Sequence, residues 1–420
     1  MRLVLFTTSY PYNASLEQPF IERELPYLAK YFSEIILIPQ VCGEKIFTAP
    51  IPVKVEEGLC RSININKKSL MGKIINVILS RAFYNEVISR PLIMLSFPKF
   101  LGLVTFITQA EVIRRWTEGW IRQSGISIDD TLFYTYWFAQ GTMGLGMVKR
   151  KIPRLKLVSR AHGYDVYEER VLPSYWPCRP QVLAALDKLF LASDHAKEYM
   201  TVHYPKFSHL YETAHLGVQD PKHITRQSED GIFRIVSCSS IVPVKRVALL
   251  LKAIARAAEL YPNQTFEWRH FGDGQEKAQL RETARIILPP NAQCVFVGYK
   301  SNDSLMRYYK EFPVDVFINV SESEGGAPVS IQEAISYGIP VIATNVGGNP
   351  EIVSDQNGIL LGPNPSPGEV AQALLTLLND SQATETKKKG SRSVWQKRYN
   401  AENNFQAFAL ELYTICLKNQ

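Results

Sequence analysis

Residues Asn319–Glu351 read NVSESEGGAPVSIQEAISYGIPVIATNVGGNPE, and this stretch decides the fold. The apolar run Val314–Val320 predicts a strand, which a turn with two adjacent glycines follows. A short helix carrying Glu333 and a second strand at Val341–Thr344 come next. This succession of strand, glycine turn, helix and strand is typical of a parallel sheet covered by helices.

The glycine turn has the features of an anion site. Gly325 and Gly326 carry no side chains where the helix begins, so backbone N–H groups there are able to approach a bound anion. Pro328 suits the first helical position, because its missing N–H would have no partner there. The carboxylates Glu324 and Glu333 flank the turn and suit the hydroxyls of a sugar and a ribose.

Strand-like and helix-like segments alternate along the rest of the chain. The further strand-like runs are Leu3–Phe6, Ile35–Pro39, Thr131–Trp137, Leu155–Arg160, Lys188–Ala192, Phe233–Cys238, Thr265–Phe271, Cys294–Val297 and Gly358–Leu361. This alternation predicts an α/β fold with one doubly wound parallel sheet in each half. The polar, aperiodic segment Gln219–Gly231 is the predicted linker. Because ligands bind beyond the carboxyl ends of such strands, we expect two facing domains with the substrate between them.

Composition indicates a soluble globular protein. The chain has 420 residues, enough for two domains of about 200 residues each, with 46% hydrophobic and 21% charged residues. No apolar run reaches the roughly 18 residues of a membrane-spanning helix, and the N-terminus reads as a buried strand rather than a secretion signal. A net charge of +7 fits phosphate-bearing ligands or an anionic membrane surface, and it does not argue for nucleic acid.

Six cysteines lie far apart without CxxC spacing. They are Cys42, Cys60, Cys178, Cys238, Cys294 and Cys416. This usage predicts reduced, buried thiols in a cytoplasmic protein rather than a disulfide scaffold.

The helical, apolar region Leu70–Trp120 interrupts the alternation, and two interpretations stay open for it. Basic residues are interspersed in and beside it: Lys67, Lys68, Lys73, Arg81, Arg90, Lys99, Arg114 and Arg115. A basic amphipathic surface can lie on anionic lipid. Alternatively, these helices simply cover the N-terminal sheet with their apolar faces.

The motif around Glu324 and Glu333 resembles the signature of family-4 retaining glycosyltransferases. In that family seven residues separate the two glutamates, whereas eight separate them here. The resemblance implies the GT-B fold, with two Rossmann-like domains facing across a cleft. It places an acceptor domain at residues 1–215, a donor domain at 216–400, and a helix at 401–420 that packs on the N-terminal domain. It also implies that Glu324 faces the transferred sugar and that Glu333 binds the ribose.

A second segment of the donor half matches the family more loosely. The family has an arginine five residues before a lysine, and both contact the diphosphate of the donor. Lys245 is retained here, Ser240 occupies the arginine position, and Arg246 follows the lysine. We expect Lys245 to neutralise the diphosphate as a point charge and Arg246 to offer it a bidentate fork. The remaining donor-binding residues implied by the resemblance are Gly272, Gly274, Val297, Gly325, Gly326, Ala327, Pro328 and Val329.

The N-terminal half supplies the candidate acceptor residues. His162 follows the predicted strand Leu155–Arg160 and precedes a glycine, and by resemblance it lies between donor sugar and acceptor. Tyr10 lies in the loop after the first predicted strand, and Asp165 follows the strand Leu155–Arg160. Tyr136 lies in the aromatic strand Thr131–Trp137 and could stack on a sugar. These three are the candidate acceptor residues. A solitary histidine is more often structural, and an aromatic strand more often belongs to the core.

The resemblance implies transfer of a hexosyl group with retention of configuration. His162, Glu324 and Lys245 are the predicted catalytic residues, and the donor is a UDP- or GDP-linked sugar with no further cofactor. The predicted acceptor is a glycan or lipid-linked saccharide of polysaccharide biosynthesis. No aspartate pair suited to a metal-bound diphosphate lies on a donor-half loop, so we expect metal-independent catalysis.

Three rival interpretations remain. A nicotinamide-dependent oxidoreductase would need a G-x-G-x-x-G fingerprint after the first strand, and none is present. A nucleotide-sugar epimerase shares the two-domain architecture. A non-catalytic scaffold of the same fold would use Leu70–Trp120 to dock on membrane. The sequence thus predicts a cytoplasmic protein, with peripheral contact at the inner face of the membrane left open.

Overall fold

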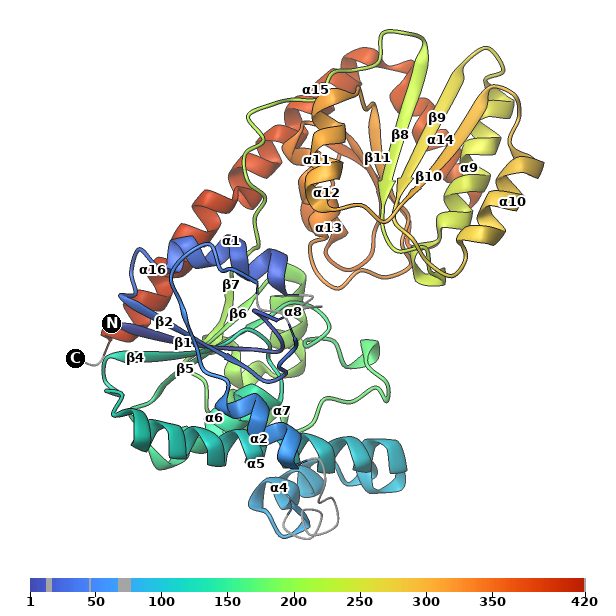
Figure 1. Cartoon of the computed structure of the whole chain (residues 1–420). Helices are drawn as coiled ribbons and strands as arrows, with labels where there is room; N and C mark the ends of the chain where they lie inside the picture. Colours follow the sequence, from blue (N-terminus) through green and yellow to red (C-terminus); the bar gives the residue numbers. More distant parts are fainter. Residues whose placement is uncertain (13–16, 45–46, 67–76, 419–420) are drawn as a thin grey trace. The chain divides into compact units, whose positions relative to one another are not determined.

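The computed structural model describes residues 1–12, 17–44, 47–66 and 77–418, which form two compact units (Figure 1). Unit 1 comprises Met1–Ala214 and the chain from Phe405 onward, whereas unit 2 comprises His215–Asn404. Lys67, Lys68 and Lys73, named above as part of a basic surface, lie outside the described residues.

Unit 1 is built on a seven-stranded parallel sheet of order β3-β2-β1-β4-β5-β6-β7. Its strands are β1 (Arg2–Thr7), β2 (Glu34–Pro39), β3 (Lys54–Val55), β4 (Thr131–Thr135), β5 (Lys156–Ala161), β6 (Lys188–Leu191) and β7 (Tyr211–Thr213). Most central positions are buried, because helices cover both faces of the sheet. Alternate residues of β1 serve two cores: Leu3 and Leu5 enter one, and Val4 and Phe6 enter the other.

Two sets of helices cover the two faces of this sheet. One core contains residues of α1 (Gln18–Leu28) and of the C-terminal helix, and the other contains residues of the remaining helices. Those helices are α2 (Gly58–Asn66), α4 (Arg81–Ser89), η1 (Pro91–Leu95), α5 (Phe97–Ser124), α6 (Gln140–Lys151), α7 (Arg179–Leu183), α8 (Asp194–His203) and η3 (Pro205–Leu210). A short turn of helix, η2 (Glu168–Arg170), follows β5. None of the helices in the described part of the chain is long and apolar enough to span a bilayer.

Unit 2 has a six-stranded parallel sheet of order β10-β9-β8-β11-β12-β13. The strands are β8 (Ile232–Cys238), β9 (Thr265–Phe271), β10 (Ala292–Gly298), β11 (Val316–Asn319), β12 (Val341–Thr344) and β13 (Gly358–Leu361). The helices are η4 (Pro243–Lys245), α9 (Val247–Leu260), α10 (Lys277–Ile287), α11 (Asn302–Glu311), α12 (Val329–Ser336), α13 (Asn349–Ile352), α14 (Pro367–Asn379), α15 (Ser381–Val394) and η5 (Trp395–Tyr399).

The C-terminal helix α16 (Ala401–Leu417) lies within the predicted range 401–420, and most of it belongs to unit 1. Phe408 and Leu412 are buried in the same core as β1 and β4. The ring of Phe408 lies 5.8 Å from that of Tyr134 and 4.9 Å from that of Phe190. The predicted return of the chain to its N-terminal half is therefore confirmed.

The predicted linker Gln219–Gly231 is wrong. The two units divide between Ala214 and His215, and the polar segment belongs to unit 2. Thr225 is buried there: its hydroxyl donates to Tyr309 O at 2.6 Å, and its N–H donates to Tyr337 O at 2.9 Å. Polar composition suggested a free connection because backbone anchoring of this kind leaves no apolar pattern.

The prediction of reduced thiols is wrong for two of the six cysteines. Cys42 and Cys60 form a disulfide in unit 1, with Cα atoms 5.8 Å apart. Cys178 and Cys416 are buried free thiols, and Cys238 and Cys294 are partly buried free thiols. Spacing in the sequence did not reveal the pair, because the segment after β2 folds back to the start of α2.

Candidate functional site

The sheet of unit 2 has a topological switch point between β8 and β11. From β8 the chain adds β9 and β10 on one side, and it then returns to add β11, β12 and β13 on the other side. The loops that follow β8 and β11 therefore start at neighbouring carboxyl ends and lead to opposite sides of the sheet. Crevices at such points are where open α/β sheets bind their ligands.

Two predicted catalytic residues meet at this switch point. Lys245 lies in η4 after β8, and its Nζ donates to Glu324 Oε1 at 2.6 Å. Asn319, the last residue of β11, donates its Nδ2 to the same carboxylate oxygen at 3.1 Å. The Glu324 side chain is 10% exposed and that of Lys245 is 24% exposed, so a ligand is able to reach both. The two loops are also joined by the N–H of Glu322, which donates to Val244 O at 2.8 Å.

Glycines let the loops around this pair pack backbone to backbone. A Cβ on Gly348 would lie 2.3 Å from Gly326 C, and one on Gly347 would lie 1.9 Å from Glu324 O. The loop after β9 makes the same kind of approach, since a Cβ on Gly272 would lie 1.8 Å from Ser239 O. Glycine is thus required for these contacts, which fix the positions of the loops that carry Lys245 and Glu324.

Helix α12 begins directly after the glycine turn. Pro328 is its N-cap with extended backbone (φ −61°, ψ 128°), so the prediction that it is the first helical residue is wrong by one position. Glu333 is buried, and its carboxylate accepts a hydrogen bond from Asn302 Nδ2 of α11. Ala327 and Val329 are partly buried against the core between α12 and the sheet. The helix thus begins shortly after Glu324 in the chain.

Arg246 points elsewhere in this structure. It has left-handed backbone (φ 50°) at the N-cap of α9, and its guanidinium donates to Pro363 O at 2.8 Å and to Asn364 Oδ1 at 2.6 Å. Its contact with a diphosphate stays a prediction. Ser240 is exposed on the same loop, and Gly274 and Val297 lie at the carboxyl ends of β9 and β10.

Sequence reasoning missed a buried histidine beneath the donor loop. His270 of β9 shares hydrogen bonds with Ser237 Oγ at 2.8 Å and with Ser239 O at 3.1 Å. Trp268 Nε1 donates to the same Ser237 hydroxyl at 2.8 Å. Burial lowers the pKa of His270 to about 4. The neutral imidazole thus supports the loop that follows β8.

In unit 1, His162 follows the carboxyl end of β5. Both of its ring nitrogens are buried and have no hydrogen-bond partner among the described residues. The ring lies 4.6 Å from that of Tyr136 and 4.7 Å from that of Trp137. Burial and the nearby Arg160 guanidinium hold the pKa of His162 well below its usual value. A buried polar atom without a hydrogen bond costs free energy. These two nitrogens therefore mark a place where a ligand or a water molecule would supply the missing hydrogen bonds.

The three predicted acceptor-binding side chains are buried inside unit 1. Tyr10, Tyr136 and Asp165 are each 0% exposed, so their predicted direct contact with an acceptor finds no exposed side-chain surface. Asp165 joins two loops: its carboxylate accepts from His162 N at 2.7 Å and from Phe138 N at 2.9 Å. It thereby joins the loops that follow β4 and β5 and holds His162 in place.

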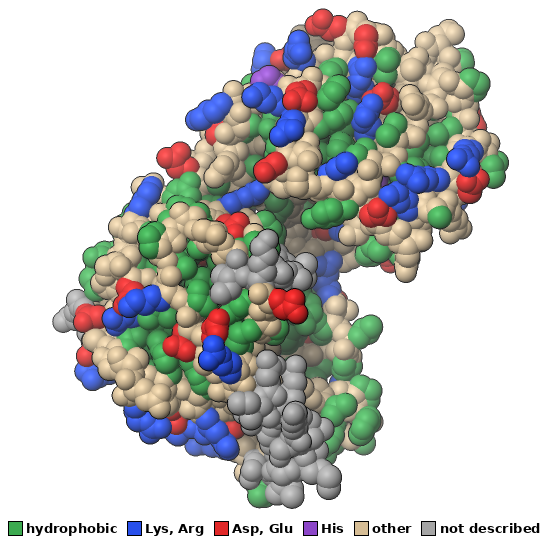
Figure 2. Space-filling model, in the orientation of Figure 1, with side chains coloured by type: hydrophobic (Ala, Val, Ile, Leu, Met, Phe, Trp, Pro, Cys, Tyr) green, Lys and Arg blue, Asp and Glu red, His purple; other side chains and the backbone are tan. Residues whose placement is uncertain are grey.

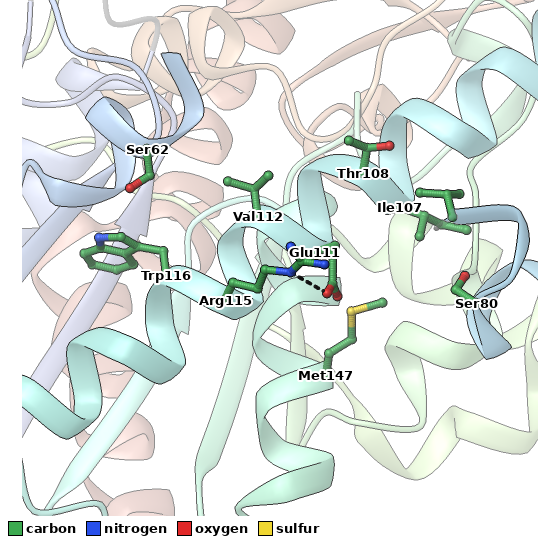
Figure 3. Close-up of a pocket in the computed structure, with 10 residues that line it drawn as sticks. Ser62, Ser80, Ile107, Thr108, Glu111, Val112, Arg115, Trp116 and Met147 are labelled. Atoms are coloured by element: carbon green, nitrogen blue, oxygen red, sulfur yellow. Dashed lines mark hydrogen bonds and ion pairs between the residues drawn. The ribbon is translucent and has the colours of Figure 1, made fainter. Parts of the chain in front are cut away.

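A cavity of about 560 Å³ in unit 1 lies apart from all these residues (Figure 3). Its lining comes mainly from one side of α5 and includes Trp116, Thr108 and the Glu111–Arg115 ion pair, whose atoms are 2.9 Å apart. Met147 of α6 closes it from the other side. None of the predicted site residues is among the residues that line it.

Two parallel-sheet Rossmann-like units, the second with a glycine turn at its switch point, define the GT-B class of fold. Residues 232–380, within unit 2, match the family model described as Glycosyl transferases group 1, so this part of the chain is similar to the domains of that family. The predicted fold and the resemblance to glycosyltransferases are confirmed.

Known proteins resemble the chain beyond this domain. The lipopolysaccharide outer core galactosyltransferase WaaB aligns with a TM-score of 0.69 at 14% identity over 99% of both chains. Anabaena HepE in complex with UDP aligns with a TM-score of 0.62 at 17% identity, covering 98% of this chain and 99% of HepE. These structural likenesses establish the fold. In sequence, the amylovoran biosynthesis glycosyltransferase AmsK of Erwinia amylovora is 22% identical over 253 residues, 59% of this chain and 61% of AmsK. The chain spans 27% to 61% of the length of the first curated relatives it matches.

Proposed function

We propose that this protein is a retaining glycosyltransferase that moves a hexosyl group from a nucleotide-diphosphate sugar to a hydroxyl of a glycan or lipid-linked saccharide. The Lys245–Glu324 pair at the switch point of a group 1 domain is the observation that carries the proposal. Anabaena HepE, which shares the fold, is bound to UDP-glucose in one of its structures, and this supports a nucleotide-sugar donor. The likeness to AmsK supports a role in polysaccharide biosynthesis.

In the proposed binding step, Lys245 exchanges the Glu324 carboxylate for the diphosphate of the donor. A diphosphate carries more negative charge than one carboxylate, so it competes with Glu324 for the Lys245 ammonium. Backbone N–H groups at the start of α12 add a second source of positive potential beside the glycine turn. Glu324, released from Lys245, then faces the sugar, and Glu333 at the buried side of α12 receives the ribose hydroxyls.

The reaction replaces one bond of the anomeric carbon by another on the same face of the sugar. The bond to the diphosphate oxygen breaks with its electron pair, and an acceptor hydroxyl oxygen forms the new bond. The hydroxyl proton passes to the departing phosphate oxygen, so no separate base is needed. Lys245 stabilises the charge that develops on the leaving group. We infer that His162 of unit 1, which is neutral because its pKa is lowered, hydrogen-bonds the acceptor through the ring nitrogens that have no partner among the described residues.

The reaction proceeds without a metal ion, because Lys245 supplies the positive charge that a metal would otherwise bring to the diphosphate. Treatment with EDTA is expected to leave turnover unchanged. Strong stimulation by manganese after chelation would contradict this part of the proposal.

The test is product analysis with a panel of UDP- and GDP-sugars and a saccharide acceptor. We expect release of the nucleoside diphosphate and a glycoside that keeps the anomeric configuration of the donor. Replacing Lys245 by Met is expected to lower kcat/KM by about 10²-fold or more, since one stabilising group of the leaving charge is lost. Lys252→Met, an exposed position on α9, is the matched control. Epimerised donor without acceptor, or an unaffected Lys245→Met variant, would contradict the proposal.

A further inference from the structure

Unit 1 exposes an unusual concentration of large hydrophobic side chains. Among the described residues, eight of the 20 exposed large hydrophobic side chains lie between Leu79 and Leu101. The most exposed of these form what we call the apolar face: Ile88 (78%), Leu92 (74%), Leu95 (83%) and Phe97 (74%). Hydrophobic side chains gather at the lower right of Figure 2, over the start of α5. Exposed apolar patches of this kind mark interaction surfaces.

The segment that carries the apolar face is anchored by its opposite side. Helix α4 buries Ala82, Phe83 and Glu86, and η1 buries Ile93. The Glu86 carboxylate is held by the Tyr175 hydroxyl at 2.8 Å. The elements η1, α4 and α5 also pack against one another. The exposed side chains therefore belong to packed helices, but they take no part in the core of unit 1 themselves.

The stretch of chain that carries the apolar face has no exposed carboxylate. From residue 77 to residue 110 the only acidic residue is Glu86, which is buried. Arg81 is exposed and Lys99 is half-buried in the same stretch. Arg90 lies deeper and is paired with Glu168 at 3.0 Å. An apolar surface with cationic residues and without exposed carboxylates is complementary to an anionic lipid surface.

The apolar surface continues toward the loop that follows His162. A groove of about 420 Å³ lies between the start of α5 and the segment 164–177 and is lined in part by Leu101, Tyr164, Leu172 and Trp176. Leu172 is 98% exposed at its edge. The one exposed carboxylate of this segment, Glu169, accepts a hydrogen bond from Tyr199 and lies next in sequence to Arg170. The apolar contact area is thus larger than the face itself.

We propose that the apolar face docks this protein on the surface of an anionic bilayer. Ile88, Leu92, Leu95 and Phe97 enter the boundary between headgroups and acyl chains, while Arg81 and Lys99 stay at the level of the lipid phosphates. This assignment is independent of the reaction proposed above, because none of these residues touches the Lys245–Glu324 pair or His162.

The test is co-sedimentation of the full chain with sucrose-loaded vesicles of phosphatidylcholine alone, or of phosphatidylcholine mixed with the anionic lipid phosphatidylglycerol. We expect binding to the anionic vesicles that weakens in high salt. The double variant Leu95→Asp/Phe97→Asp is expected to lower the partition coefficient at least about tenfold, since it removes buried apolar area and adds repulsion. Ile286→Asp/Tyr299→Asp is the matched control, since both positions are more than 80% exposed in unit 2.

Each other outcome overturns the assignment. Absence of sedimentation with anionic vesicles, or equal binding by Leu95→Asp/Phe97→Asp and the control variant, would show that the face does not dock on lipid. Equal binding to both vesicle types would show that Arg81 and Lys99 do not recognise anionic headgroups. If sedimentation velocity shows a dimer that the Leu95→Asp/Phe97→Asp variant dissociates, and vesicles are not bound, the face is covered by a second copy of this chain. Unchanged thermal unfolding of the variant confirms that its fold is intact.

Discussion

Lys245 and Glu324 form an ion pair in which Nζ lies 2.6 Å from Oε1. The pair keeps two mobile side chains in one place, and Asn319 fixes the carboxylate from the strand end below it. In the proposed reaction this ion pair weakens donor binding, because the diphosphate has to replace Glu324 as the partner of Lys245. The same carboxylate is therefore expected to oppose nucleotide binding and to promote sugar transfer.

The variant Glu324→Gln separates these two effects. With the competing charge removed, Lys245 is free to bind a diphosphate, so we expect the affinity for UDP or GDP to rise several-fold in isothermal titration calorimetry. Transfer to the acceptor is expected to fall by about 10²-fold, because the residue that faces the sugar has lost its charge. Weaker nucleotide binding by Glu324→Gln would contradict the proposed exchange of partners.

His270 gives unit 2 a pH-dependent stability. Its folded-state pKa of about 4 lies below that of an unfolded histidine, so as pH falls below about 6.5 the unfolded state takes up a proton that the folded state does not. Urea unfolding of the wild type is expected to lose about 2 kcal/mol from this residue between pH 7 and pH 5. In His270→Asn this part of the loss disappears, whereas His209→Asn, at an exposed position, retains it. An unchanged pH dependence in His270→Asn would exclude the role of this imidazole.

At the scale of elements, the site depends on loops that touch through their backbones. The turn Glu324–Gly326 is backed by Gly347 and Gly348, and the loop after β8 is backed by Gly272 and Gly274. Four loops from the carboxyl ends of parallel strands are thus fixed against one another without side chains between them. This packing positions the start of α12 and the Lys245–Glu324 pair.

Replacing Gly348 by Ala tests this arrangement. The new Cβ would lie 2.3 Å from the backbone of Gly326, so the turn has to move. We expect a loss of about 1–3 kcal/mol in stability and weaker donor binding, measured by thermal unfolding with and without a nucleotide sugar. Gly362→Ala has open space around it and is the matched control, expected to change stability by less than about 0.5 kcal/mol. Equal effects of the two variants would argue against the loop packing.

Much of unit 2 was predictable because buried parallel strands are continuous apolar runs, and the glycine turn after β11 was read in the correct place. Pro328 was wrong by one position, since its fixed φ suits an N-cap as well as the first helical turn. The acceptor contacts of Tyr10, Tyr136 and Asp165 stay predictions, and the full burial of their side chains depends on packing between elements that local sequence does not reveal. His270 was missed because a histidine inside a strand resembles any other core position.

At the scale of the whole molecule, the chain begins and ends in the same unit. Residues of α16 complete the core formed by α1 and the sheet of unit 1, and Arg160 lies over the ring of Phe408 at 4.5 Å. Unit 1 is thus built from two segments that lie far apart in the sequence. The position of this helix and its packing on unit 1 were both implied by the family resemblance.

The variants Leu412→Ala and Leu410→Ala test whether α16 packs on unit 1 through its buried face. Leu412 is 0% exposed in the core of unit 1, whereas Leu410 is 48% exposed on the other side of α16. Leu412→Ala is expected to cost about 2–5 kcal/mol in chemical unfolding and Leu410→Ala less than about 0.5 kcal/mol. Similar costs for both variants would mean that α16 does not use this face to pack on unit 1.

The most direct measurement of the central claim is a crystal structure with a nucleotide-diphosphate sugar bound. We predict the diphosphate within hydrogen-bond distance of Lys245 Nζ and the start of α12, with Glu324 turned from the lysine toward the sugar. A donor bound elsewhere, with the 2.6 Å Lys245–Glu324 pair intact, would contradict the account.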